Sequence, residues 1–156
     1  MAEEHAKLLD GIGRKILLEL QENARMPFTE LGKRVGLSTP AVMDRVRRLE
    51  DAGIIKGYRA DVDFSAMGYP ILAFIAVNVV GDFMPRMSKL AKSIPEILEC
   101  HRVTGSNTFM IKVVAGSVEE LEKTIDRLTP YVATTTSLVL SSLVGRRSIE
   151  PKFKKI

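Results

Sequence analysis

The strongest constraint on the fold lies in residues 27–53, which predict two helices joined by a tight turn. Gly36 fits the left-handed position that often follows a helix, and Ser38 fits the N-cap of the next helix. That second helix has one apolar stripe, formed by Val42, Val46 and Leu49. The pattern is typical of a helix-turn-helix, whose second helix enters the major groove of DNA.

A third helix is expected before this pattern, over residues 11–22, where Asp10 is suited to the N-cap. Apolar residues recur there at helical spacing: Ile12, Ile16, Leu17 and Leu20. The segment ends before Pro27, which suits the first turn of the following helix. We therefore expect a helix-turn-helix domain over residues 1–53.

The second half of the chain has another pattern. Residues 54–68 predict an extended hinge with a short strand, and residues 69–145 predict a second domain. Its strands are expected over 71–80, 96–104, 108–115 and 134–143, and its helices over 83–93 and 117–129. The order βαββαβ indicates a ferredoxin-like sandwich, so the whole chain is of the α+β class. Residues 146–156 form a basic tail.

Positive charge is concentrated in two parts of the chain. The net charge is +4, and residues 33–59 hold seven Lys or Arg against three Asp or Glu. Residues 60–145 hold seven against nine, and the tail holds five against one. A basic first domain and tail around a nearly neutral middle suit a nucleic-acid-binding protein whose middle part has another task.

Several classes of protein are disfavoured. The single cysteine, Cys100, allows no internal disulfide and suits the reducing cytoplasm. No apolar run approaches the roughly 20 residues that span a bilayer, so no membrane partner is expected. Cys100 and His101 are adjacent in a strand and point to opposite faces, so they form no catalytic pair. We expect no enzyme activity, no cofactor and no metal site, and we expect the methionines to fill the core.

The candidates for DNA contact lie at the start and along the exposed side of the second helix of the motif. They are Ser38, Thr39, Arg45, Arg47 and Arg48, with Lys33 and Arg34 of the preceding helix as further candidates. A helix N-terminus offers backbone N–H groups to phosphate, and arginine binds phosphate or guanine. The alternative is a solvated helix face with a capping serine.

The chain resembles the Lrp/AsnC, or feast/famine, transcription regulators over about its whole length. The resemblance is carried by residues 15–25, by the run from Gly36-Leu37-Ser38 to Ile54-Ile55, and by residues 98–105. It implies a DNA-binding regulator that binds double-stranded DNA as a homodimer, or as a tetramer or octamer. It also implies an amino-acid effector bound near the loop that follows Gly105.

The effector residues implied by this resemblance depart from the family pattern. The family loop usually has the form Gly-Asp-x-Asp-aromatic, whereas this chain has Gly105, Ser106, Asn107 and Thr108 before Phe109. Both acidic positions are lost, so the ammonium group of an amino acid meets only neutral partners. Thr134 and Thr136 share one face of the last strand and are expected to line the same pocket, with an assembly interface as the alternative.

A second departure is Asp44, which stands where many family members have a basic residue; it either accepts from a cytosine amino group or pairs with an arginine. Three functions remain open. The first is a sequence-preferring regulator modulated by an amino-acid-like effector, and the second is an architectural protein that wraps DNA and binds no effector. The third is an enzyme similar to the haem-pathway decarboxylases, against which the lack of a reactive His/Arg pocket argues.

Overall fold

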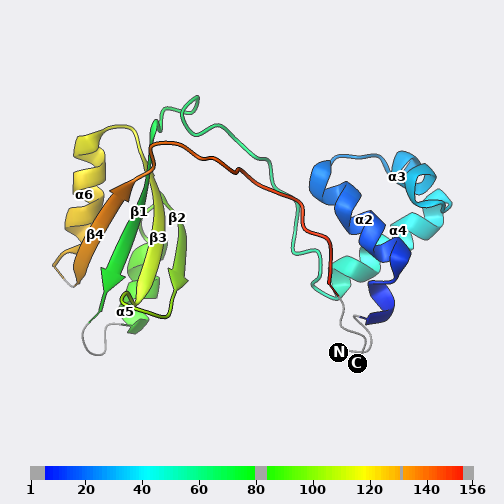
Figure 1. Ribbon diagram of the computed structural model, residues 1–156, viewed down its shortest axis with the longest axis horizontal. Helices are drawn as coiled ribbons and strands as arrows, with labels where there is room; N and C mark the ends of the chain where they lie inside the picture. Colours follow the sequence, from blue (N-terminus) through cyan, green and yellow to red (C-terminus); the bar gives the residue numbers. More distant parts are fainter. Residues whose placement is uncertain (1–5, 80–83, 131, 153–156) are drawn as a thin grey trace. The chain divides into compact units, whose positions relative to one another are not determined.

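The computed structural model describes residues 6–79, 84–130 and 132–152. The chain forms two compact units (Figure 1). One, the HTH unit, comprises the chain up to Asp61 together with the tail from Val144, and the other, the sheet unit, runs from Val62 to Leu143. The sequence predicts boundaries after residues 53, 68 and 145. That these boundaries separate independently folding segments stays a prediction. Within the described residues, no helix is long and apolar enough to cross a bilayer.

The helix-turn-helix of the HTH unit is built from α2 (Gly11–Glu22), α3 (Phe28–Val35) and α4 (Thr39–Asp51), and a short helical segment at residues 6–8 precedes α2. The N-cap predicted for α2 is confirmed, because the Asp10 carboxylate accepts from the backbone N–H of Gly13 at 2.8 Å. Pro27 is the N-cap of α3 rather than a residue of its first turn. One buried core joins the three helices and includes Ile16, Leu20, Leu31, Val35, Val42, Val46 and Leu49.

The turn between α3 and α4 depends on two glycines. Gly36 has a φ of 75°, the left-handed conformation that the sequence predicts for it. Gly32 lies against the turn, where a Cβ atom would stand 2.6 Å from the carbonyl oxygen of Leu37. The backbone N–H of Leu37 donates to the carbonyl of Gly32 at 2.9 Å, so the turn closes directly onto α3. Any side chain at position 32 would push α4 away from α3.

Beyond α4 the chain becomes extended. Gly53, with a φ of 67°, follows Ala52, the C-cap of α4, and residues 54–61 form a connector along the HTH unit. The short strand expected in this segment is not present among the described residues, because no backbone pairing to another strand is formed there. Ile54 and Ile55 remain half-buried beside the HTH core.

The sheet unit contains β1 (Ile71–Asn78), α5 (Met84–Lys92), β2 (Ile97–Arg102), β3 (Phe109–Ala115), α6 (Val118–Leu128) and β4 (Ala133–Leu138). The strand order is β2-β3-β1-β4 and all pairs are antiparallel, which is the predicted ferredoxin-like topology. Both helices pack on one face (Figure 1). Side chains alternate along β1, so Ala73, Ile75 and Val77 enter the core while Phe74 lies on the open face.

The last strand is shorter than predicted. It ends at Leu138, and only the backbone N–H of Val139 continues the pairing, to the carbonyl of Leu72 at 2.9 Å. The neighbouring strand begins at Ile71, directly after Pro70, which has no N–H to donate. Residues 140–143 therefore have no strand to pair with. The last residue expected in the first strand, residue 80, and the first residue expected in the following helix, residue 83, lie outside the described residues.

Asp10 stabilises the HTH unit twice, as the N-cap of α2 and as the partner of Arg45 at 2.7 Å. The hydrogen bond from Arg45 is the main reason that the pKa of Asp10 is lowered. We expect Asp10→Ala to reduce the free energy of unfolding by about 1–2 kcal/mol, the sum of a lost cap and a partly solvated ion pair. Asp10→Asn keeps a capping side chain and should cost less than 1 kcal/mol, about the value of the pair.

Urea denaturation followed by circular dichroism measures both losses. Because the pKa of Asp10 is lower in the folded state, its charge stabilises the fold above the unfolded pKa of about 3.9. This contribution is lost as the pH falls through the folded value. The difference in the free energy of unfolding between wild type and Asp10→Asn should therefore vanish in acid. A difference that persists below the folded pKa of Asp10 would contradict a stabilising pair between Asp10 and Arg45. Asp126→Asn, at an exposed residue of α6, is the control.

Candidate nucleic-acid interface

The exposed side of α4 lies opposite the buried stripe and carries mainly charged side chains. Ser38 is the N-cap residue, in an extended conformation, and its side chain makes no capping hydrogen bond. The N-cap position that the sequence predicts is therefore confirmed, whereas a side-chain cap is not formed. Pro40 has no backbone N–H, so the N–H groups of Thr39 and Ala41 and the positive end of the helix dipole remain available to a phosphate. Thr39, the first residue of α4, is half-buried.

Arg47 and Arg48 extend from this side into solvent. Their side chains are 81% and 59% exposed. Each lies near one carboxylate of its own helix: Arg47 is 3.9 Å from Asp51 and Arg48 is 4.0 Å from Asp44. Of the two roles considered for Asp44, the structure shows the pairing with an arginine. Exposed pairs of this length are worth less than about 1 kcal/mol, so DNA phosphates can replace them.

Arg45 has a different environment from its two neighbours. Its guanidinium group donates to the Asp10 carboxylate at 2.7 Å, and its side chain is only 30% exposed. This pair joins α4 to the start of α2. Arg45 therefore stabilises the fold, and its expected contact with DNA stays a prediction.

The two basic candidates of α3 also differ from each other. The guanidinium group of Arg34 is held by Glu30 at 2.7 Å and by Glu19 of α2 at 2.8 Å, and these bonds raise its pKa. Lys33 is exposed and takes part in none of the ion pairs found among the described residues. Lys33 is thus the better placed of the two for a phosphate contact.

Met43 is the residue of this surface that the sequence analysis missed. We expected the methionines to fill the core, and Met26 and Met87 do so, but Met67 is 58% exposed and Met43 is 50% exposed in the middle of α4. Its position one helical turn from Arg47 places it on the same side of the helix. An apolar side chain there is suited to contact the methyl group of thymine. The sequence does indicate this exposure, because Met43 is not part of the buried stripe formed by Val42, Val46 and Leu49.

The candidate effector loop is anchored to the end of β1. The backbone N–H of Thr108 donates to the carbonyl of Val77 at 2.8 Å, and its hydroxyl accepts from Val79 at 3.3 Å. Thr108 therefore positions the loop. Gly105 has a φ of 109°, and the Asn107 amide donates to the Ser106 hydroxyl at 3.4 Å, so these three residues form its tip.

Thr134 and Thr136 share a face of β4, as alternation predicts, but that face is the one covered by helices. They stand opposite Val77 and Ile75 in the register of β1, and both of these residues are buried in the core. Both threonines are half-buried. The structure therefore does not bring them together with Ser106 and Asn107 on an open surface, and their effector role stays a prediction.

Cys100 and His101 point to opposite faces of β2, which confirms the expectation that they form no nucleophile–base pair. Cys100 packs against the core, and burial raises the pKa of its thiol. His101 lies on the open face with Glu99, 3.0 Å from its carboxylate. Lys112 donates to the same carboxylate at 3.2 Å, and these two partners lower the pKa of Glu99.

A helix-turn-helix with an exposed second helix, joined to a ferredoxin-like βαββαβ unit, is the architecture of a two-domain DNA-binding regulator. Residues 9–50 match the AsnC-type helix-turn-helix domain, and residues 72–149 match the Lrp/AsnC ligand binding domain. The chain belongs to the Lrp/AsnC family of transcriptional regulators. This family assignment confirms the resemblance found in the sequence, and it makes the chain a regulator rather than an enzyme.

Three relatives show how far the similarity extends. The transcriptional regulator LrpC of Bacillus subtilis is 35% identical over 135 residues, which cover 86% of this chain and 94% of LrpC. Its solved structure matches with a TM-score of 0.84 at 34% identity, covering 88% of this chain and 99% of that chain.

Two further structures are complexes with L-methionine. The Neisseria meningitidis regulator NMB0573 matches with a TM-score of 0.86 at 29% identity, covering 90% and 96% of the two chains. The Mycobacterium tuberculosis feast or famine regulatory protein Rv3291c matches with a TM-score of 0.84 at 32% identity, covering 92% and 99%.

We expect the double variant Arg47→Ala/Arg48→Ala to bind DNA more weakly while keeping its fold, because neither side chain enters the core. If each arginine contacts one phosphate, the slope of log K against log salt should become shallower by about 0.9 per residue. Fluorescence anisotropy with DNA fragments that the wild-type protein retains from sheared genomic DNA measures both quantities.

Lys123→Ala, an exposed position of α6 in the sheet unit, is the matched control and should bind like wild type. Unchanged affinity and slope in the double variant would exclude this side of α4 from the DNA interface.

Proposed function

We propose that this protein is a sequence-preferring transcriptional regulator that acts in the cytoplasm, assembles through its sheet units and responds to an amino-acid-like effector. The observation that supports the sequence preference is the exposed side of α4, where Met43, Arg47 and Arg48 lie opposite the buried stripe. These residue types recognise base edges as well as phosphates. Loss of selective retention of genomic fragments by Arg47→Ala/Arg48→Ala tests this function.

Assembly is supported by the open face of the sheet. Phe74 is 39% exposed on β1, and its neighbours in the register are Lys112 on β3 and Ser137 on β4. Ala76, Met110 and Thr135 form the next row of the same face. An aromatic side chain with Ala76 and Met110 on the same open face supports a contact surface, and a twofold axis would place two such faces together. A dimer of this kind would present two α4 helices to a pseudo-palindromic site.

The substitution Phe74→Lys should dissociate the assembly, because it buries a charge in the proposed interface. Multi-angle light scattering at micromolar concentration should give wild-type particles at twice the chain mass of 17.3 kDa or more, and variant particles at that mass. The control is Val118→Lys, at an exposed valine at the start of α6. A wild-type monomer, or a Phe74→Lys variant of unchanged mass, would contradict the proposed interface.

An effector role is supported by the loop tip of Gly105, Ser106 and Asn107, and by the two relatives solved with L-methionine. The tip offers neutral donors and acceptors, and no carboxylate stands at the two positions that are acidic in the family pattern. The ammonium group of an amino acid would then rely on hydroxyl and carbonyl oxygens alone. This chemistry supports weak binding of amino acids in general.

We expect isothermal titration calorimetry with L-methionine and the other common amino acids to show weak or no binding for most of them. Any amino acid that binds should change both DNA affinity and particle mass, because an effector must bind two states differently to shift their equilibrium. Its effect should be lost in Asn107→Ala, whereas DNA binding without effector stays the same. Lys123→Ala, an exposed position of α6 outside the candidate effector residues, is the control.

Submicromolar binding of an amino acid that is insensitive to Asn107→Ala would show that the effector site lies elsewhere. The absence of any effector would instead favour the architectural alternative, in which the protein wraps DNA without sensing a ligand.

A further inference from the structure

The C-terminal tail is part of the HTH unit and is fixed to α2 by one side chain. The Gln21 amide nitrogen donates to the carbonyl of Ile149 at 3.1 Å, and the backbone N–H of Ile149 donates to the Gln21 amide oxygen at 3.1 Å. The same amide nitrogen also donates to the carbonyl of Leu17 at 3.1 Å, which holds its orientation. Gln21 therefore binds the tail backbone as a neighbouring strand would.

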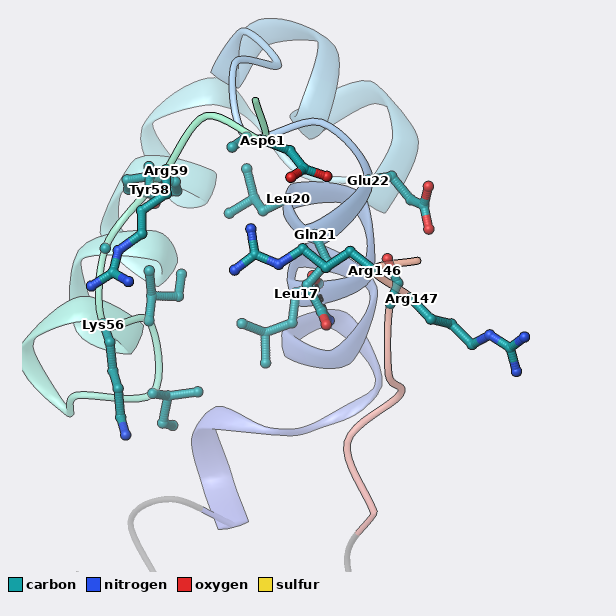
Figure 2. A pocket seen from close by; sticks show the side chains of 15 residues that line it. Leu17, Leu20, Gln21, Glu22, Lys56, Tyr58, Arg59, Asp61, Arg146 and Arg147 are labelled. Atoms are coloured by element: carbon teal, nitrogen blue, oxygen red, sulfur yellow. Dashed lines mark hydrogen bonds between the residues drawn. The ribbon is translucent and has the colours of Figure 1, made fainter. Parts of the chain in front are cut away.

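The attachment of the tail creates a basic cleft within the HTH unit. The cleft has a volume of about 980 Å³ and lies between α2, the connector and the tail (Figure 2). Lys56 and Arg59 line it from the connector, and Arg146 and Arg147 line it from the tail. Figure 2 shows Arg146 extending across α2 toward the connector and Arg147 pointing outward from the tail. Two carboxylates, Glu22 and Asp61, also line the cleft, so its cations are in excess.

These four cations differ from the basic residues of the helices. The ion pairs found among the described residues involve Arg34, Arg45, Arg47, Arg48, His101 and Lys112, and none of the cleft cations. Helix α4 contains three arginines and three acidic residues, so the helix that should enter the groove has no net charge. Helix α2 is neutral as well, with two basic and two acidic residues. The surplus positive charge of the HTH unit therefore lies largely in the connector and the tail.

DNA binding requires such a surplus, because neutralisation of phosphates supplies most of the sequence-independent affinity. Lys56 lies five residues beyond the end of α4, which an extended chain spans in about 18 Å at most. The backbone of a duplex bound by α4 is thus within reach of the connector. All four cations are exposed, which suits a polyanion that remains hydrated better than a small ligand, which a pocket buries almost completely.

We propose that Lys56, Arg59, Arg146 and Arg147 form a second DNA-binding surface that contacts the sugar-phosphate backbone next to the segment recognised by α4. Gln21 is its positioning residue, since it fixes the tail that carries two of the four cations. The inference rests on the proposed function of DNA binding. It assigns sequence selection and sequence-independent affinity to different parts of the HTH unit. The helix α4 selects the sequence, and the cleft supplies affinity that is independent of sequence.

The experiment measures DNA affinity of the full-length protein between about 50 and 200 mM salt, with a retained genomic fragment and a mixed-sequence duplex of equal length. Arg146→Gln/Arg147→Gln and Lys56→Gln/Arg59→Gln should each make the slope of log K against log salt shallower by up to about 1.8. Both double variants should lower the affinity for the two duplexes by the same factor, because phosphate contacts carry no sequence information. Lys123→Gln is the control and should match wild type.

Gln21→Ala tests the positioning role without removing a charge. It should make the slope of log K against log salt shallower by as much as Arg146→Gln/Arg147→Gln does. Combined with that double variant, it should have no further effect. Thermal unfolding should be unchanged in this variant, since Gln21 is exposed and alanine favours the helix. A normal slope in Gln21→Ala would remove the positioning role.

Three outcomes would overturn the DNA surface. A wild-type slope in both cleft variants, with a shallower slope in Arg47→Ala/Arg48→Ala, would leave DNA binding to the helices alone. A changed particle mass in the cleft variants would identify the occupant as a second copy of the chain. Saturable calorimetric binding of inorganic pyrophosphate that the cleft variants lose, with unchanged DNA slopes, would identify a small-anion site. Wild-type protein without DNA affinity would instead reject the proposed function itself.

Discussion

The burial of one side of α4 is the interaction on which the rest of the HTH unit depends. Val42, Val46 and Leu49 are almost fully excluded from water and pack against residues of α2 and α3. Burial of each such side chain is worth about 1.5–3 kcal/mol, more than any exposed ion pair of the unit. This packing fixes the rotation of α4 about its axis. The opposite side, with Met43, Arg47 and Arg48, is then presented to solvent as a consequence.

The charged residues of the unit divide between two tasks because of this packing. Arg34 and Arg45 lie where neighbouring helices approach each other. The guanidinium group of Arg34 therefore pairs with carboxylates of α2 and α3, and that of Arg45 pairs with the N-cap residue Asp10. Arg47 and Arg48 point away from the other helices and keep only long contacts within α4. The same residue type therefore stabilises the fold at two positions and remains available for DNA at two others. A count of arginines alone does not distinguish these cases.

Most of the architecture follows from local patterns in the sequence. The helices around Gly36 and the ferredoxin-like order of strands were predictable, because apolar periodicity and glycine or capping residues act over a few positions. The extent of the last strand was not, since it depends on where β1 begins in the pairing register. For the same reason, alternation placed Thr134 and Thr136 on a common face but did not tell which face the helices cover.

The site was less predictable than the fold. The pairing of Arg45 with Asp10 joins residues 35 positions apart, and the contact of Gln21 with Ile149 joins residues 128 positions apart. No periodicity within either segment indicates such contacts. The exposure of Met43 was implied by the stripe at 42, 46 and 49, yet hydrophobicity alone suggested a core position. Sequence therefore identifies the helix that should contact DNA more reliably than the side chains that do so.

The central claim is that α4 lies in the major groove of the DNA that this protein selects. Methylation interference tests it directly, because dimethyl sulfate modifies the N7 atom of guanine in the major groove, an atom to which arginine donates. On a retained genomic fragment, N7 methylation at a few guanines within the protected region should abolish binding by the wild-type protein. Binding that is insensitive to every N7 methylation, but is blocked by a ligand occupying the minor groove, would contradict the account.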